Sequence, residues 1–206
     1  MHSATLDQHA LRVGRVSMAW NGLHETFYSM FAWIVGRENA EGRHDLHLPY
    51  GIWHSVQNDT AQRGFLRAAA ATTDDKRFIR AINWITAQAE KIGTERNALI
   101  HSAVVLTMGD DNQMKTEPSR LSGRKGHLTQ FAEKPTMRDW DRVAGNLRVL
   151  AQYAGSVEVS QFYPVQEGWT RSWPYRPRLL GLAGSVKPRP PQRKRKPPKP
   201  ARPRPA

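Results

Sequence analysis

Residues 16–34, VSMAWNGLHETFYSMFAWI, contain the clearest structural signal in this sequence of 206 residues. Apolar side chains recur there at spacings of four and three: Val16, Trp20, Leu23, Phe27, Met30 and Ile34. This spacing places them on one face of an α-helix, which must be buried against other elements. We therefore predict a long amphipathic helix over residues 6–36, ended by Gly36 and the polar run that follows it.

A second helix is predicted over residues 52–71, where Ile52, Phe65 and an alanine run supply an apolar side. It follows a loop marked by Asp45, Pro49 and Gly51. Because His44, Asp45 and His47 lie in this loop without a partner motif, no metal site is predicted there.

Two shorter helices are predicted next along the chain. The first begins after a cap at Thr73 or Asp74 and ends at Gly93, a residue that often follows a helix. The second is capped by Thr94 and runs to about Met108.

The last third of the chain changes in character. Residues 109–135 are polar and predict a loop, and a final helix starts near Thr136 and loses its pattern at Gly155. Residues 156–186 predict an extended, aromatic-rich arm that packs back on the helices. Residues 187–206 contain eight prolines, which predict a disordered or polyproline tail.

These segments together predict an all-α fold, a four- to five-helix up-and-down bundle formed by residues 1–155. The chain has no cysteine, which excludes disulfides and thiolate zinc sites. It has neither a signal-peptide pattern nor an uncharged apolar stretch of about 18 residues, so we expect a cytoplasmic protein without a membrane span.

The charge is concentrated at one end of the chain. The formal net charge is +13, but residues 187–206 hold nine of the 31 Lys and Arg residues and no acid, and without them it is +4. We expect this tail, including Arg193, Lys194, Arg195 and Lys196, to attract RNA through its phosphates. A solubility role, or a polyproline ligand for a partner domain, is the alternative.

The stretch TERNALIHS at residues 94–102 sets polar residues into an otherwise apolar helix. Asn97 and His101 are four residues apart and share a helical face, and Arg96 precedes them. If a helix begins at Thr94, Arg96 lies in its first turn, where a cation is unfavourable unless a phosphate binds there.

The pattern Arg96-Asn97-x-x-x-His101 in a helical bundle resembles the motif of the HEPN superfamily (higher eukaryotes and prokaryotes nucleotide-binding domains). The resemblance covers residues 6–155, but only the six-residue motif is matched position by position. It implies a metal-independent endoribonuclease without a cofactor, of the kind found in toxin–antitoxin, anti-phage or RNA-processing systems. It also implies a homodimer in which two motifs face each other, and an antitoxin or other protein partner.

By the same resemblance, Arg96 and His101 are catalytic and Asn97 supports them. The 2′-hydroxyl of RNA would attack the adjacent phosphorus and leave a 2′,3′-cyclic phosphate, which excludes DNA as a substrate. One histidine would act as base and its dimer mate as acid, while Arg96 stabilises the phosphate.

Three further residues are candidates for substrate binding. Glu25 lies outside the apolar stripe of the first helix, where a solvated face is the simpler interpretation. Asp59 and Arg63 are four residues apart on the second helix, the spacing of an ordinary surface salt bridge.

Trp169 and Trp173 could stack bases, although packing over the bundle is favoured.

Two other functions fit the same residues. One is a non-catalytic helical module that binds nucleic acid or protein, in which the motif is only a structural contact. The other is an antitoxin-like or scaffold protein whose tail recruits RNA. The enzyme requires Arg96 and His101 to point into one groove, whereas a His101 buried against a backbone carbonyl favours the alternatives.

Overall fold

The computed structural model describes residues 2–38, 42, 44–100, 104–108, 114–118, 137–163 and 172–181. The protein is mostly helical, and five helices pack together, as the sequence predicts. They are α1 (His2–Val35), α2 (His47–His54), α3 (Asp59–Ala70), α4 (Lys76–Ile100) and α5 (Met137–Phe162). His101, Trp169 and the predicted tail at 187–206 lie outside the described residues.

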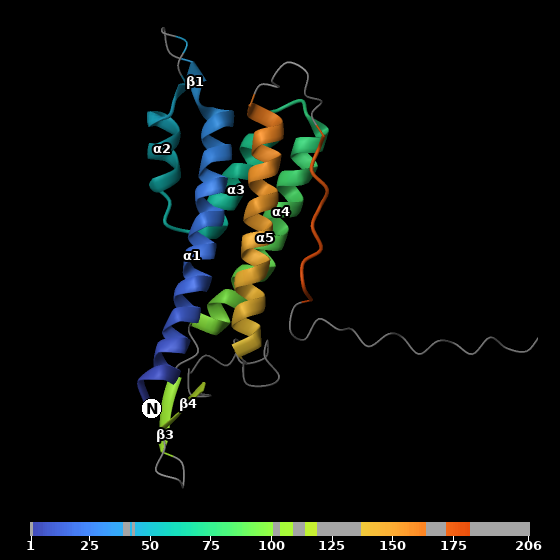
Figure 1. The fold of residues 1–206 in the computed structure, drawn as a ribbon. Helices are drawn as coiled ribbons and strands as arrows, with labels where there is room; N and C mark the ends of the chain where they lie inside the picture. The colour runs from blue at the N-terminus through green and yellow to red at the C-terminus, as the bar shows by residue number, and fades with distance from the viewer. Residues whose placement is uncertain are drawn as a thin grey trace, which may run out of the picture.

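Four of these helices surround the core, and α2 packs on the outer side of α1 (Figure 1). Both α1 and α4 contact α3 and α5. Helices α1 and α5 run in parallel, because an Arg12–Asp141 ion pair of 3.5 Å joins them near one end and Trp33 stacks on Phe162 near the other. Helix α4 runs antiparallel to α5.

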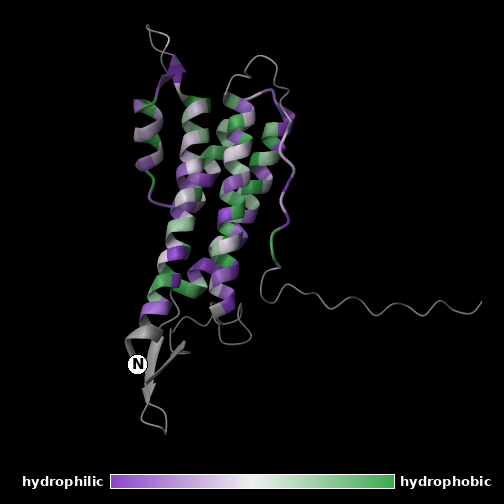
Figure 2. Ribbon diagram, in the orientation of Figure 1, coloured by the Kyte–Doolittle hydropathy of each residue, from purple (hydrophilic) through white to green (hydrophobic). Residues whose placement is uncertain are grey.

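The core contains most of the apolar stripe that defines the first predicted helix. Val16, Leu23, Phe27 and Met30 have no exposed surface, and Trp20 is 5% exposed. Each helix carries apolar residues between hydrophilic ones, so its apolar face can turn inward (Figure 2). Among the described helices, none has a stretch that is long and apolar enough to cross a membrane.

The prediction of a single helix over residues 52–71 is wrong, because two helices, α2 and α3, occupy this region. Asn58 separates them: its Oδ1 accepts hydrogen bonds from the backbone of Thr60 (2.8 Å) and Ala61 (3.4 Å), which starts α3. Pro49, predicted in a loop with Gly51, lies in the first turn of α2, where proline removes no helical hydrogen bond.

The helix boundary predicted at Gly93 is also wrong, because α4 is continuous from Lys76 to Ile100. Asp75, rather than Thr73 or Asp74, accepts hydrogen bonds from the first free amides. Thr94 is no cap: its hydroxyl donates to the Glu90 carbonyl one turn earlier (3.0 Å).

Gly93 has a packing role instead of a terminating one. A Cβ at this position would lie 2.7 Å from Cη2 of Trp20, so glycine leaves the space in which the Trp20 ring of α1 lies against the backbone of α4. Because α4 does not begin at Thr94, Arg96 lies in the last turns of a long helix. A cation is favoured there, so Arg96 is not at an unfavourable helix start and needs no bound phosphate to be tolerated.

The described fold is not entirely α-helical, because it also contains two antiparallel β-hairpins. Strands β1 (Arg37–Glu38) and β2 (His44–Asp45) form one, and β3 (Val104–Met108) and β4 (Met114–Pro118) form the other. The prediction of a helix that reaches Met108 is therefore wrong, because β3 occupies 104–108. The prediction of a loop over 109–135 is also wrong in part, because β4 lies within that range. The sequence of β3, VVLTM, is rich in β-branched residues, which favour a strand.

Helix α5 also differs from the prediction, because it continues past Gly155 to Phe162. Residues 156–162 are therefore part of the helix and not of an extended arm. Two buried contacts explain the extension: Val157 is fully buried, and Glu158 accepts a hydrogen bond from Ser29 of α1.

Residues 172–181 are the described part of the predicted arm, and they pack on the bundle. Trp173 and Leu179 are partly buried against the core. The Asn146 side chain anchors the arm through two hydrogen bonds to the backbone of Leu180, of 3.0 and 2.9 Å.

We expect Gly93→Ala to lower the free energy of unfolding by about 1–3 kcal/mol, because the new methyl group would overlap the Trp20 ring. Gly145→Ala in α5 is the matched control, since no other described atom lies within 4 Å of its would-be Cβ. Alanine should stabilise α5 by up to about 1 kcal/mol. Urea denaturation measures both variants, and equal stabilities would contradict this packing role.

Candidate functional site

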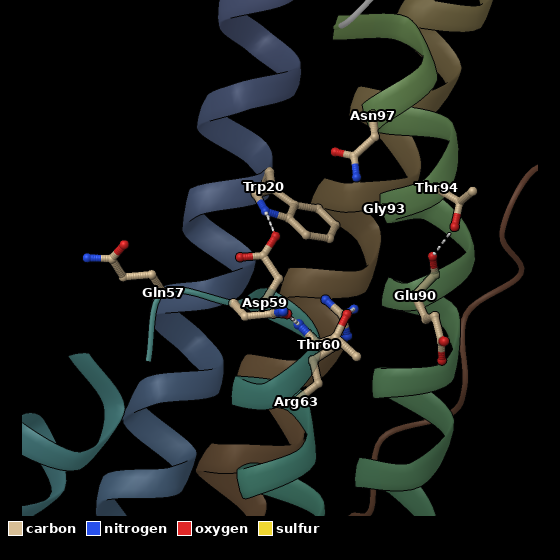
Figure 3. Close-up of a pocket in the computed structure, with 10 residues that line it drawn as sticks. Trp20, Gln57, Asp59, Thr60, Arg63, Glu90, Gly93, Thr94 and Asn97 are labelled. Carbon is tan, nitrogen blue, oxygen red and sulfur yellow. Dashed lines mark hydrogen bonds between the residues drawn. The ribbon is translucent and has the colours of Figure 1, made fainter. Parts of the chain in front are cut away.

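A cleft of about 430 Å³ opens between α1, the start of α3 and the C-terminal half of α4 (Figure 3). Its walls come from three segments that are far apart in the sequence. The lining residues are Trp20, Gln57, Asn58, Asp59, Thr60, Arg63, Glu90, Gly93, Thr94 and Asn97.

Trp20 connects the three walls of this cleft. Its Nε1 donates a hydrogen bond of 3.2 Å to Oδ2 of Asp59, which ties α1 to the first residue of α3. Its ring packs on Gly93, and the guanidinium of Arg96 lies 5.5 Å from the ring centroid. Arg63 lies 6.0 Å from the same ring, so cations of two helices approach one indole.

The two described residues of the sequence motif contact each other at this cleft. Arg96 Nη1 donates a hydrogen bond of 2.8 Å to Oδ1 of Asn97, which lines the cleft. Arg96 Nε is buried and has no hydrogen-bond partner within the described residues. His101 comes directly after α4 in the sequence, but its position relative to this pair lies outside what the structure describes.

Asp59 and Arg63, two of the candidates for substrate binding, line the same cleft as Asn97. They do not form the predicted surface salt bridge, since Asp59 bonds Trp20 and Arg63 is buried, with 5% of its surface exposed. Arg63 Nη2 donates to the Thr60 hydroxyl at 3.1 Å. Burial lowers the pKa of Arg63, and the carboxylates of Asp59 and Glu90 oppose this shift.

The third candidate, Glu25, is exposed and does not line the cleft. The structure thus places Asn97, Asp59 and Arg63 in the lining of one cleft and Arg96 beside the Trp20 ring that lines it, while Glu25 stays apart.

His24 is a neighbour of the site that the sequence analysis does not single out. Its Nδ1 lies 3.3 Å from Oε1 of Gln62 and 4.0 Å from Oδ1 of Asp59, and its ring lies 4.8 Å from Trp20. Burial lowers the pKa of His24, Asp59 raises it, and Arg63 and Arg96 lower it. The spacing of four from Trp20, on the same helical face, is the signal that would have indicated this position.

No protein-family model, curated protein or solved structure matches this chain. Among the described residues, no three His, Asp or Glu side chains are grouped as a metal site requires. The side chains that line the cleft define its chemistry. These supply guanidinium, amide and hydroxyl donors beside two carboxylates.

We expect acid to destabilise the protein partly through His24. Because its pKa in the folded state is lowered, the unfolded chain binds the proton first as the pH falls below about 6.5. The free energy of unfolding should therefore decrease from that pH downwards. His24→Asn cannot titrate, so its stability should fall less than that of the wild type between pH 8 and pH 5.

Urea denaturation at several pH values measures this difference. His9, whose pKa is also lowered, is present in both proteins, so its contribution cancels. Parallel pH profiles of wild type and His24→Asn would show that His24 does not titrate differently on folding.

Proposed function

We propose that this protein is a metal-independent endoribonuclease of the HEPN type. The observation that carries the proposal is the hydrogen-bonded Arg96–Asn97 pair at a polar cleft, with His101 completing the Arg-Asn-x-x-x-His motif in the sequence. The packing of α4 against α3 and α5 within a bundle of five helices is consistent with the bundle that the resemblance implies.

Arg96 is suited to bind the scissile phosphate. Its Nη1 is oriented by Asn97, and this one hydrogen bond leaves other N–H groups of the partly exposed guanidinium for non-bridging oxygens. A guanidinium fixed before the reaction can stabilise the charge that grows on those oxygens. We therefore assign Asn97 the role of positioning Arg96.

His101 would act on the attacking nucleophile. It takes the proton of the 2′-hydroxyl, the 2′-oxygen bonds to phosphorus, and the bond to the 5′-oxygen breaks, which leaves a 2′,3′-cyclic phosphate. The leaving 5′-oxygen needs a proton from a second group. A second copy of the chain, contributing its own protonated His101, would supply it, so the proposed enzyme is a homodimer with a composite site.

The C-terminal arm supports RNA as the substrate. Arg142 Nη1 donates both to Oε2 of Glu95 (3.0 Å) and to the carbonyl of Gly181 (3.1 Å), so the described arm ends beside the residue that precedes Arg96. The basic segment 187–206 begins six residues later in the sequence, within at most roughly 20 Å of extended chain. Its cations would raise the local concentration of RNA near the motif.

A non-catalytic module that binds nucleic acid or protein is the second candidate function. The cleft itself favours this function, because its lining residues could bind a ligand without the participation of His101. A toxin–antitoxin, anti-phage or RNA-processing setting, with an antitoxin or other protein partner, belongs to the enzyme proposal.

We expect His101→Ala and Arg96→Ala each to slow cleavage of a synthetic RNA at least about 100-fold, because they remove a proton-transfer group and the phosphate ligand. His47→Ala, an exposed histidine on α2, is the control and should cleave at the wild-type rate. The reaction should proceed in EDTA and leave a 2′,3′-cyclic phosphate. An RNA with a single 2′-deoxyribose at the cut position should resist it.

Gel analysis and mass spectrometry of the products measure these effects. Cleavage by His101→Ala at the wild-type rate would contradict the proposed mechanism. A wild-type protein that binds RNA but never cuts it would favour the non-catalytic module.

A further inference from the structure

The cleft holds a buried cation whose hydrogen-bonding capacity is not filled. Arg63 is 5% exposed, its Nη2 is used by Thr60, and its Nη1 is enclosed with no partner among the residues described. A buried donor without a partner is costly, and an apolar side chain of similar volume would usually serve stability as well. A ligand with an acceptor atom would supply the missing partner.

Carboxylates stand on two walls of the same cleft. Asp59 comes from the start of α3 and its side chain is 44% exposed; Oδ2 accepts the Trp20 hydrogen bond, and Oδ1 lies 4.0 Å from Nδ1 of His24. Glu90 lines the cleft from α4 and is also exposed (Figure 3). Two carboxylates repel a phosphate, so the cleft is poorly suited to a bare anion and suited to a ligand with both donors and acceptors.

Guanine presents such a pattern on one rigid ring. Its O6 and N7 accept hydrogen bonds from a guanidinium, and its N1–H and amino group can donate to a carboxylate. Adenine lacks the carbonyl, uracil lacks the amino group, and cytosine has an amino group without an adjacent ring N–H, so none of the three presents both the paired acceptors and the paired donors of guanine. A volume of about 430 Å³ lies within the range of small-ligand pockets.

We propose that this cleft binds a guanine base of the RNA substrate, with Arg63 and Asp59 as the residues that select it. This inference rests on the proposed function, because the base is placed beside the scissile phosphate. Asn97 makes the connection: it lines the cleft and accepts the hydrogen bond that orients Arg96. A guanine held by Arg63 would thus position its nucleotide against Arg96.

The first test measures binding of GMP, AMP, CMP, UMP and inorganic phosphate to the full-length protein by isothermal titration calorimetry. We expect GMP to bind at least about tenfold more tightly than each of the others. Arg63→Met should reduce GMP affinity at least about tenfold without lowering the melting temperature, since it removes a buried cation with an unfilled donor. Arg77→Met, an exposed arginine outside the cleft, is the matched control and should bind GMP as the wild type does.

A second variant keeps the inference testable if Arg63→Met does not fold. Asp59→Asn retains an oxygen acceptor for Trp20 but loses the carboxylate, so it should weaken GMP binding more than AMP binding. Equal affinity for all four nucleotides, phosphate binding as tight as GMP binding, or unchanged GMP affinity in both variants would each overturn the inference.

Cleavage mapping separates this inference from the nuclease proposal. The wild type is given an RNA that contains all sixteen dinucleotide steps, and cuts adjacent to guanine support the base site. Cuts without base preference that disappear in His101→Ala would overturn the base site and leave the nuclease intact. Selective GMP binding without cleavage would support the base site and overturn the nuclease.

Discussion

The close approach of Trp20 to Gly93 is the constraint on which the candidate site depends. The indole occupies the space that a side chain at position 93 would need, so the Trp20 ring of α1 lies directly against the backbone of α4. The same ring donates its N–H to Asp59 and lies beside the guanidinium groups of Arg63 and Arg96. One buried aromatic side chain thus fixes the relative positions of three helices and of the charges that they carry.

This constraint has a chemical consequence, because it holds polar groups in a partly buried place. Arg63 and His24 both have lowered pKa values, and burial is the main cause in each case. A fixed and poorly solvated guanidinium interacts more strongly with a ligand than one in open solvent. The Arg142–Glu95 ion pair on another side of α4 links the same helix to α5 and to the end of the arm.

The sequence predicts the parts of the fold that arise from regular apolar spacing. The stripe from Val16 to Met30 is buried, and a mostly helical bundle forms around it. Breaks between elements were harder to predict, because Gly93 looks like a helix terminus and is in fact a site of close packing. Asp59 and Arg63 could be named as candidates from their spacing. Their meeting with Asn97 could not, because it depends on how α3 packs against α4.

The proposed binding of RNA in the cleft beside Trp20 can be tested through the indole signals in a ¹H–¹⁵N spectrum. The ligand would be a short guanine-containing RNA with 2′-deoxyribose at the cut position, and Trp20→Phe would assign the signal. We expect the Trp20 signal to shift on binding, while that of Trp84, which lies beneath Arg176 of the arm, stays unchanged. A shift of the Trp84 signal with an unchanged Trp20 signal would show that the RNA does not bind in this cleft.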